Sequence, residues 1–234
     1  MERQPKKAIV LGATGLVGNR LTRRLLEDEQ YGEVLVFTRR ASGMSHSKLK
    51  EIRADLLSLQ AQKPVFKADV VFCCVGTTRA KTPDKERYRE VDYGIPVTAA
   101  RLCRENGIPA YQVISSLGAS EKSPFFYNRL KGKMEMEVLG YALEETHILQ
   151  PSLIGGKREE VRKGERFAQG LMRFLDPVLL GSLAKYRMIQ PEDIAQAMHY
   201  LADHPRKDPS IPSDLIRSIA REARGKNYNK STRA

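Results

Sequence analysis

The stretch Lys7-Ala8-Ile9-Val10-Leu11-Gly12-Ala13-Thr14-Gly15-Leu16-Val17-Gly18 lies close to the N-terminus and decides the fold class. Its first five residues predict a short buried strand, and the three glycines follow at once. Leu21, Leu25 and Leu26 then continue an apolar helical pattern. The glycines are therefore expected at a strand-to-helix turn, which is typical of a site for the pyrophosphate of a dinucleotide.

Each glycine of this turn has a separate physical reason. Gly12 permits the tight turn, Gly15 lets a pyrophosphate approach the backbone, and Gly18 lets the helix pack on the sheet. The spacing is Gly-x-x-Gly-x-x-Gly rather than Gly-x-Gly-x-x-Gly. The cofactor-binding residues expected in the turn are Gly12, Thr14, Gly15, Leu16, Val17 and Gly18.

Five more apolar runs predict strands, and helical patterns separate them. The runs lie at residues 33–38, 50–54, 68–75, 110–114 and 146–150. Strands that alternate with helices indicate a parallel sheet. The expected fold is α/β: a doubly wound, mostly parallel Rossmann sheet with helices on both faces and a small C-terminal substrate-side lobe.

The sequence also predicts several helices and a division of the chain into domains. Residues 84–106 predict a long helix that is interrupted near Gly94-Ile95-Pro96, and further helices are predicted at 165–175 and from Pro191. We expect a nucleotide-binding domain at 1–156, an integral substrate-side extension at 157–205 and a basic, mobile tail at 206–234.

Cys73 and Cys74 lie near the end of the fourth predicted strand and are interpreted as small buried hydrophobic residues.

The end of the second strand reads Thr38-Arg39-Arg40. An NAD site usually places a carboxylate here for the ribose hydroxyls. Two cations and no carboxylate favour the additional phosphate of NADP, so Arg39 and Arg40 are predicted to bind it. The alternative is a basic turn that holds no ligand.

Other cofactor contacts are expected where strands end. Asp55 either approaches the adenine or caps the helix that Leu56 begins, and capping is the simpler interpretation. The loops after the fourth and sixth strands lie at the carboxyl end of the sheet, where ligands bind in such folds. The residues expected here are Asp55, Leu56, Val75, Gly76, Thr77, Pro151 and Leu153.

A compact acid–base unit follows the fifth strand. Ser115 and Ser116 end that strand, and Tyr127-Asn128-Arg129-Leu130-Lys131 places a phenol and an ammonium at i and i+4 on one helix face. A phenol alone is a poor base at neutral pH, and a neighbouring ammonium favours its ionised form. Together with a serine hydroxyl, this is equipment for carbonyl–alcohol interconversion. The alternative is an ordinary helix with one buried and one solvated residue.

Composition limits the other classes of function. The 234 residues are 41% hydrophobic and 29% charged, with a net charge of +12. No apolar run approaches the ~18 residues of a membrane span, and the N-terminus lacks the pattern of a signal peptide. Three cysteines are too few for a disulfide scaffold, so we expect a cytoplasmic protein. The four histidines show no metal-ligand spacing, and no metal is expected.

The positive charge is concentrated near the C-terminus. Residues 206–234 carry eight basic and three acidic side chains. A solvated tail is the simpler interpretation, and a nucleic-acid partner is the alternative. Tyr228 is the tail's one aromatic residue, which is poor provision for base stacking.

Several motifs together resemble an atypical short-chain dehydrogenase/reductase, and most closely the Tat-interacting protein family and its bacterial relatives. The resemblance covers about residues 7–204, and its most specific part is the Cys-Cys-x-Gly-Thr-Thr-Arg string. The matching stretches are residues 12–18, Phe72 to Arg79, Val91-Asp92-Tyr93, Ser115 to Ala119, Tyr127 to Gly132 and Pro151-Ser152-Leu153.

The resemblance implies an NADPH-binding Rossmann domain with a Ser-Tyr-Lys site. Tyr127 would be the catalytic acid/base, Lys131 would tune it and hold the nicotinamide ribose, and Ser116, with Ser115 second, would be the carbonyl partner. Pro151-Ser152-Leu153 would lie near the nicotinamide. Many members of the wider superfamily keep a relay asparagine where this chain has Asp92, so the relay differs here.

The function expected from the sequence is an NADP(H)-dependent oxidoreductase acting on a small carbonyl or alcohol. The alternative is an NADPH-binding regulator with little turnover that controls a protein partner. The substrate and the oligomeric state stay open. Candidate pocket walls are Thr77, Thr78, Arg79, Phe125, Phe126, Ile154, Phe167 and Phe174.

Overall fold

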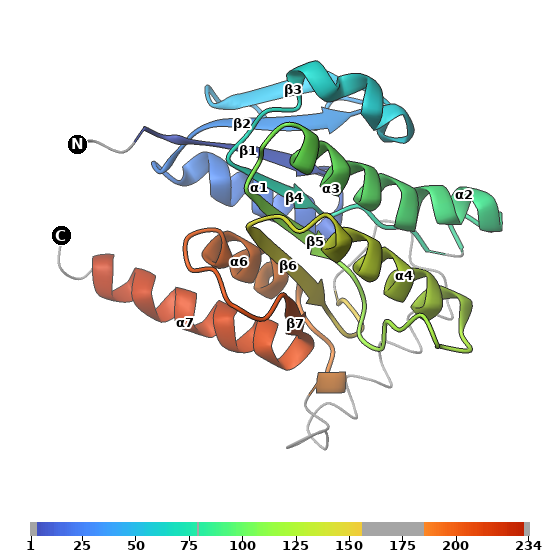
Figure 1. Cartoon of the computed structure of the whole chain (residues 1–234). Helices are drawn as coiled ribbons and strands as arrows, with labels where there is room; N and C mark the ends of the chain where they lie inside the picture. Colours follow the sequence, from blue (N-terminus) through green and yellow to red (C-terminus); the bar gives the residue numbers. More distant parts are fainter. Residues whose placement is uncertain (1–3, 79, 156–184, 232–234) are drawn as a thin grey trace.

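Strand β1 (Lys6–Leu11) lies in the interior of the sheet, third from one edge. It pairs in parallel with β2 (Tyr31–Thr38) on one side and with β4 (Val70–Cys73) on the other. The computed structural model describes residues 4–78, 80–155 and 185–231. Within these residues the sheet has seven parallel strands in the order β3-β2-β1-β4-β5-β6-β7, which Figure 1 shows from top to bottom. The strand order reverses at β1, and such a reversal leaves a crevice at the carboxyl edge.

The remaining strands complete both halves of the sheet. They are β3 (Leu49–Arg53), β5 (Ala110–Ile114), β6 (Glu145–Gln150) and β7 (Ser210–Pro212). The six strands predicted from the sequence are confirmed, although the fourth is shorter than expected. The seventh was not predicted, and its three residues pair with β6.

Two helical layers cover the sheet, so the doubly wound fold is confirmed. Helices α1 (Leu16–Glu27), α6 (Pro191–Leu201) and α7 (Ser213–Ser231) share one apolar cluster with Ala8 and Val10 of β1. The short helix η1 (Leu56–Val65) and α3 (Ile95–Glu105) share the other with Ile9 and Leu11, as does α4 (Phe126–Gly140). Side chains alternate along β1 because successive strand residues point to opposite faces. None of the described helices combines the length and apolar character that a membrane crossing requires.

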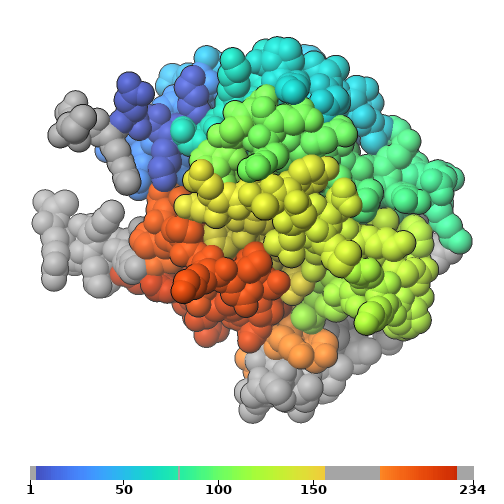
Figure 2. Space-filling model, in the orientation of Figure 1, coloured from blue at the N-terminus to red at the C-terminus, as the bar shows by residue number. Residues whose placement is uncertain are grey.

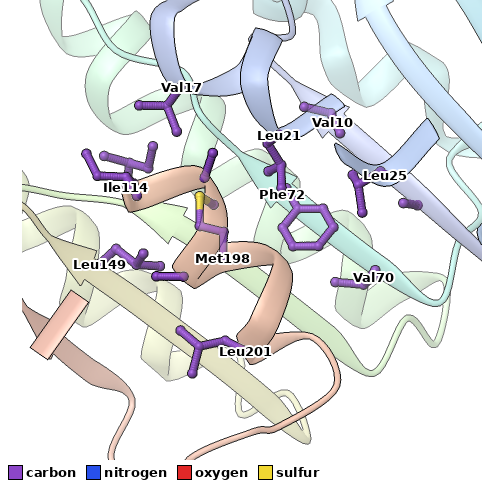
Figure 3. Close-up of a cluster of buried hydrophobic side chains, with 14 of the residues drawn as sticks. Val10, Val17, Leu21, Leu25, Val70, Phe72, Ile114, Leu149, Met198 and Leu201 are labelled. Carbon is purple, nitrogen blue, oxygen red and sulfur yellow. The ribbon is translucent and has the colours of Figure 1, made fainter. Parts of the chain in front are cut away.

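The first cluster joins the N-terminal unit to the C-terminal helices. Leu21 of α1 and Phe72 of β4 lie next to each other in this cluster, and Met198 of α6 lies beside them (Figure 3). Each of these three side chains is 0% exposed. The helix predicted from Pro191 is therefore confirmed and packs on α1, whereas the helix predicted at 165–175 lies outside the described residues.

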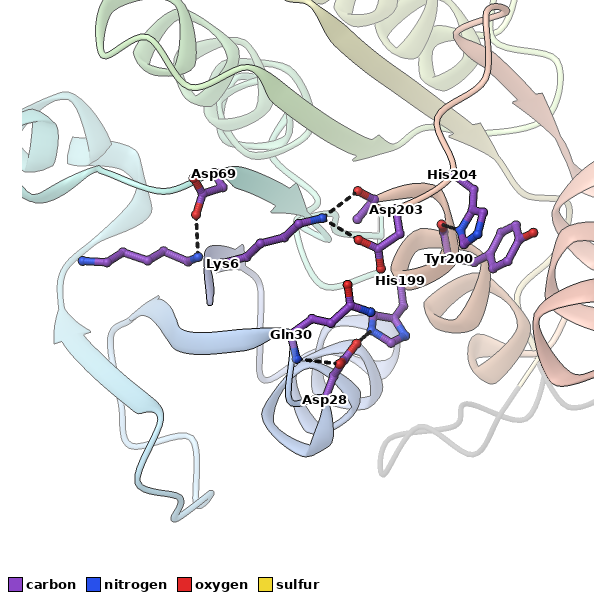
Figure 4. Close-up of polar contacts among 10 residues, drawn as sticks. Lys6, Asp28, Gln30, Asp69, His199, Tyr200, Asp203 and His204 are labelled. Atoms are coloured by element: carbon purple, nitrogen blue, oxygen red, sulfur yellow. Dashed lines mark hydrogen bonds and ion pairs between the residues drawn. The ribbon is translucent and has the colours of Figure 1, made fainter. Parts of the chain in front are cut away.

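Polar contacts reinforce the same junction (Figure 4). Lys6 at the start of β1 forms an ion pair with Asp203, just beyond α6, and its ammonium also donates to the Ala202 carbonyl. The His199 ring on α6 contacts the Asp28 carboxylate at 2.7 Å. This hydrogen bond is the main reason that the pKa of Asp28 is lowered. The end of α1 and the start of β1 are thus tied to α6.

The predicted interruption of the helix at 84–106 is confirmed, and it has a defined geometry. Helix α2 (Lys85–Arg89) passes into the π-helical turn η2 (Glu90–Gly94), and α3 then begins. Pro96 lacks a backbone N–H, so the carbonyl of Asp92 cannot receive the usual i+4 hydrogen bond. The Ile95 N–H instead donates to the Glu90 carbonyl, five residues back, which is the hydrogen bond of a π-turn.

The predicted tail is wrong for residues 210–231. Ile211 of β7 adds to the sheet, and α7 packs on α6. Figure 2 shows this segment, in red, continuous with the body of the molecule. Beside its many basic residues, this segment carries apolar residues at helical spacing. Among them, Ile216, Ile219 and Ala223 are at most 2% exposed.

Replacing Leu21 by Ala tests the junction between α1 and α6. The substitution leaves a cavity in the first cluster, so we expect the free energy of unfolding to fall by about 2–5 kcal/mol. Leu139 on α4 is 41% exposed and provides the matched control, since Leu139→Ala is expected to change it by at most about 0.5 kcal/mol. Equal losses in the two variants, measured by denaturant unfolding, would contradict this account of the core.

Candidate functional site

A cavity of about 780 Å³ opens at the carboxyl edge of the sheet, beside the glycine turn. Its walls come from the turn and α1, from the segment after β4, from η2, from the end of β5, from α4 and from the segment after β6. The described residues that line it are Thr14, Gly15, Leu16, Val17, Asn19, Arg20, Cys74, Val75, Gly76, Thr77, Thr78, Lys81, Asp92, Ile114, Ser115, Tyr127, Lys131 and Ile154.

The glycine turn is packed so closely that larger residues do not fit. Gly12 has φ +82°, and a Cβ there would lie 2.9 Å from the Cys74 carbonyl oxygen. A Cβ on Gly18 would lie 2.2 Å from the Gly12 carbonyl oxygen. Gly15 lines the cavity, and its N–H donates to the Gly12 carbonyl at 2.9 Å. The turn therefore leaves an open cradle in front of α1, where helix N–H groups favour a phosphate.

The face of α4 toward the cavity carries Tyr127 and Lys131, one turn apart. The Tyr127 side chain is 37% exposed, and its ring meets that of Tyr88 edge-on at 6.2 Å between centroids. Lys131 is only 2% exposed, and its ammonium donates to the Ile114 carbonyl at 3.3 Å. The phenol is thus at the mouth of the cavity and the ammonium at its floor.

Asp92 completes the floor as the partner of Lys131. Its carboxylate lies 3.1 Å from the ammonium and is 1% exposed. The second oxygen accepts the backbone N–H of Thr77 at 2.8 Å. Burial by itself lowers the pKa of Lys131, but the Asp92 charge, with Tyr127 adding to it, outweighs burial and holds that pKa above its usual value. Lys131 is therefore a permanent cation at neutral pH.

Ser115, and not Ser116, lines the cavity. Tyr111 and Val113 of β5 belong to the cluster under α4, and Ser115 continues this row because strand side chains alternate. The Ser115 hydroxyl hydrogen-bonds with Glu135 of α4, whereas that of Ser116 donates to the Leu117 carbonyl at 3.2 Å. Strand alternation thus places Ser115, the second choice from the sequence, on the cavity, and the catalytic role of either serine stays a prediction.

The predicted cofactor residues fall into two sets. Those that the structure brings together on the cavity are Thr14, Gly15, Leu16, Val17, Val75, Gly76, Thr77, Tyr127 and Lys131. Gly12 and Gly18 lie beneath the turn and shape it. Arg39 and Arg40 are exposed beyond the end of β2 and do not line the cavity.

Asp55 and Leu56 also lie away from the cavity lining. The Asp55 side chain caps η1 by accepting the Leu57 N–H at 3.2 Å, which confirms the simpler interpretation of this residue. Leu56 packs against the second apolar cluster.

The loop after β6 lines the cavity through Ile154, one of the candidate pocket walls, and not through the expected cofactor contacts Pro151 and Leu153. Ile154 reaches the cavity, whereas the Pro151 carbonyl accepts the Leu117 N–H at 2.8 Å and Leu153 is 42% exposed. The candidate walls Phe125 and Phe126 are surface residues, 72% and 40% exposed. Arg79, Phe167 and Phe174 lie outside the described residues.

Sequence reasoning missed several cavity residues. Asn19 and Arg20 lie on the first turns of α1, and Lys81 follows the loop after β4. Their proximity to the glycine turn and to the Gly-Thr-Thr string was the available signal. Arg20 forms an ion pair with Glu192 of α6.

Cys73 is buried as predicted, whereas Cys74 is partly exposed and lines the cavity. Cys73 belongs to the second apolar cluster and Cys74 packs against the first. Burial raises the pKa of both thiols. In the described part of the chain, no group of three or more His, Cys, Asp or Glu side chains is placed to hold a metal ion.

The parallel sheet, with its reversal at β1 and the cavity beside it, defines an α/β protein of the Rossmann class. Residues 8–213 match the family described as "NAD dependent epimerase/dehydratase family". Because the match spans most of the sequence, the chain belongs to this family.

Individual relatives carry the name FMP52. "Protein FMP52, mitochondrial" of Candida albicans is 32% identical over 186 residues, which cover 75% of this chain and 80% of the relative. "Protein fmp52, mitochondrial" of Aspergillus fumigatus is 35% identical over 172 residues, which cover 69% and 74%. The wider resemblance to short-chain dehydrogenases/reductases is confirmed by the family match, and the specific one to the Tat-interacting protein family stays a prediction.

Solved structures confirm the fold. The UDP-N-acetylglucosamine 4-epimerase of Methanobrevibacter ruminantium M1, in complex with UDP-N-acetylmuramic acid, has a TM-score of 0.65 at 18% identity. The match covers 89% of this chain and 76% of that one. MoeE5, in complex with UDP-glucose and NAD, has a TM-score of 0.64 at 19% identity and covers 94% and 82%.

The predicted cytoplasmic location is wrong, because the FMP52 relatives are named as mitochondrial. The prediction depended on the cysteine count. A low count indicates a reducing compartment and does not distinguish one such compartment from another.

Replacing Lys131 by Met tests the ion pair at the cavity floor. The variant leaves the Asp92 carboxylate buried without its partner, so we expect a loss of about 3–5 kcal/mol in the free energy of unfolding. Changing Asp92 to Leu in the same chain should restore much of the loss. Lys133→Met, at an exposed position of α4, is the control and should unfold like the wild type. A single Lys131→Met variant as stable as the control would show that the pair is not buried as described.

Proposed function

We propose that this protein is an NADP(H)-dependent oxidoreductase of the short-chain dehydrogenase/reductase type that acts on a small carbonyl or alcohol. One observation carries the proposal: a phenol, a buried ammonium and a hydroxyl meet in one cavity that is continuous with the glycine turn. Tyr127, Lys131 and Ser115 supply these groups. Membership in an NAD-dependent family supports the redox assignment.

Each residue has a role that follows from its place. Tyr127, at the cavity mouth, passes a proton to or from the substrate oxygen. Lys131, charged and fixed by Asp92, offers hydrogen bonds toward the ribose of the cofactor. Ser115 takes the carbonyl-partner role first given to Ser116, because it is the serine on the cavity. When bound, the nicotinamide dinucleotide supplies or accepts the hydride.

NADP(H) is the proposed cofactor form. The family description and several structural neighbours name NAD, whose site usually carries an acidic residue after the second strand. This chain has Thr38-Arg39-Arg40 there, and both arginines are exposed at the protein surface. A guanidinium pairs well with the two negative charges of a ribose phosphate.

A second candidate function is an NADPH-binding regulator that presents a surface to a protein partner. Phe125 and Phe126, directly before Tyr127, are exposed by 72% and 40%, which supports a contact surface near the cavity mouth. This alternative expects tight nucleotide binding together with negligible turnover.

Replacing Tyr127 by Phe tests the proposed chemistry. Single-turnover oxidation of NADPH over a panel of small aldehydes and ketones should slow by about 100-fold or more, because the proton carrier is lost. Tyr141→Phe, at the far end of α4, is the control and should retain the wild-type rate. An unchanged rate in Tyr127→Phe would refute the assigned role. Tight NADPH binding by the wild type without turnover on any member of the panel would favour the regulator.

Replacing both Arg39 and Arg40 by Ala tests the cofactor form. Each charge-assisted hydrogen bond to the phosphate contributes about 1.5–3 kcal/mol, so the Kd for NADPH should rise by at least about tenfold while that for NADH stays unchanged. The exposed Arg104 on α3 provides the control substitution. Equal effects on the two nucleotides, measured by calorimetric titration, would show that these arginines do not read the ribose phosphate.

A further inference from the structure

Helix α4 carries a third polar residue on the face of Tyr127 and Lys131. Glu135 is four residues beyond Lys131, so it lies on the same face one turn further along the helix. It is half-buried and is not among the cavity-lining residues described above. The proposed function gives this carboxyl group no role.

Glu135 is held by two partners from neighbouring strands. One of its carboxyl oxygens, Oε1, hydrogen-bonds with the Ser115 hydroxyl at the end of β5. The Gln150 amide, at the end of β6, donates to the two carboxyl oxygens at 3.1 and 2.9 Å. The carboxyl group therefore links the cavity serine to the adjacent strand.

Ser115 itself has little freedom. It is 3% exposed, and its backbone N–H donates to the Leu149 carbonyl at 2.7 Å. With the oxygen fixed, the remaining variable is the direction of the hydroxyl hydrogen. A hydroxyl has one hydrogen to donate and two lone pairs that can accept. A neighbour that accepts the hydrogen therefore leaves only lone pairs for a ligand in the cavity.

The surroundings of Glu135 shift the pKa of its carboxyl group in opposite directions. Burial is the largest effect and raises the pKa of its carboxyl group. The hydrogen bonds from Ser115 and Gln150, and the charge of Lys131 on the same helix, oppose it. Lys131 is itself paired with Asp92 from η2, which offsets part of its charge. Glu135 therefore keeps its proton to a higher pH than an ordinary carboxyl group.

We propose that Glu135 is a positioning residue whose protonation state decides whether Ser115 donates a hydrogen bond into the cavity; this rests on the proposed function. The ionised carboxylate accepts the Ser115 hydrogen, and the cavity then meets only lone pairs. The protonated carboxyl group donates its own hydrogen to the Ser115 oxygen instead. The Ser115 hydrogen is then released to bond the substrate carbonyl oxygen.

The change in hydrogen bonding between Glu135 and Ser115 should make the rate of carbonyl reduction depend on pH, in one direction. Carbonyl reduction needs a donor at the developing oxyanion, and removal of one such donor slows comparable reactions by about 100-fold or more. The rate constant for a bound substrate should fall as pH rises through the ionisation of Glu135. The side chain of Glu135→Gln carries no titrating proton, so this fall should disappear.

The kinetic experiment compares pH profiles of single-turnover NADPH oxidation. The wild type should lose up to about 100-fold in rate relative to Glu135→Gln on the alkaline side of the Glu135 ionisation. Glu137→Gln, two residues away at an exposed position of α4, is the control and should follow the wild type. Superimposable profiles of the wild type and Glu135→Gln would overturn the proposal.

An infrared experiment tests the same coupling without turnover. The carbonyl stretch of the protonated carboxyl group, assigned by its loss in Glu135→Gln, is titrated in the wild type and in Ser115→Ala. Loss of the Ser115 hydrogen bond disfavours the ionised form, so the band should persist to higher pH in Ser115→Ala. An identical titration in the two proteins would overturn the proposal even if an active substrate is found. A shifted titration without turnover on any carbonyl would uphold the coupling and count against the proposed function alone.

Discussion

The ion pair between Lys131 and Asp92 is the constraint on which the site depends. Both side chains are at most 2% exposed, and their charged atoms lie 3.1 Å apart. Removing two charges from water is expensive, and the mutual attraction of a buried pair often only balances that expense. The main effect of the ion pair is therefore to fix the positions of the elements that carry its two side chains. It ties α4 to η2, and through the Thr77 N–H it also fixes the loop after β4.

The rest of the fold brings these elements to one edge. Parallel strands end on the same side, and the reversal of strand order at β1 opens the crevice between the glycine turn and the loop after β4. The two apolar clusters hold α1 and α4 on opposite faces of the sheet, so the cradle and the phenol face one cavity from different sides. The contact of Asp28 with His199 ties the end of α1 to α6, and the ion pair of Lys6 with Asp203 ties the start of β1 to the same helix end.

Much of this arrangement was predictable because it follows local rules. The glycine turn, the alternation of strands with helices and the Tyr-x-x-x-Lys spacing each depend on residues close together in the chain. The choice between Ser115 and Ser116 depends on which face of β5 meets α4, and the sequence does not reveal it because all five residues of β5 are buried. The net charge of the C-terminal segment favours a solvated tail, whereas the helical spacing of Ile216, Ile219 and Ala223 gives the segment a buried apolar face. The partnership of Asp92 with Lys131 is long-range and depends on a π-turn, which no local pattern reveals.

A crystal structure of the protein with bound NADPH tests the central claim most directly. The account predicts the nicotinamide end of the nucleotide in the cavity beside Tyr127, Lys131 and Ser115. The pyrophosphate should lie at the glycine turn, and the ribose phosphate should contact Arg39 or Arg40. A nucleotide bound with its nicotinamide outside this cavity, or a glycine turn that leaves the pyrophosphate without contact, would contradict it.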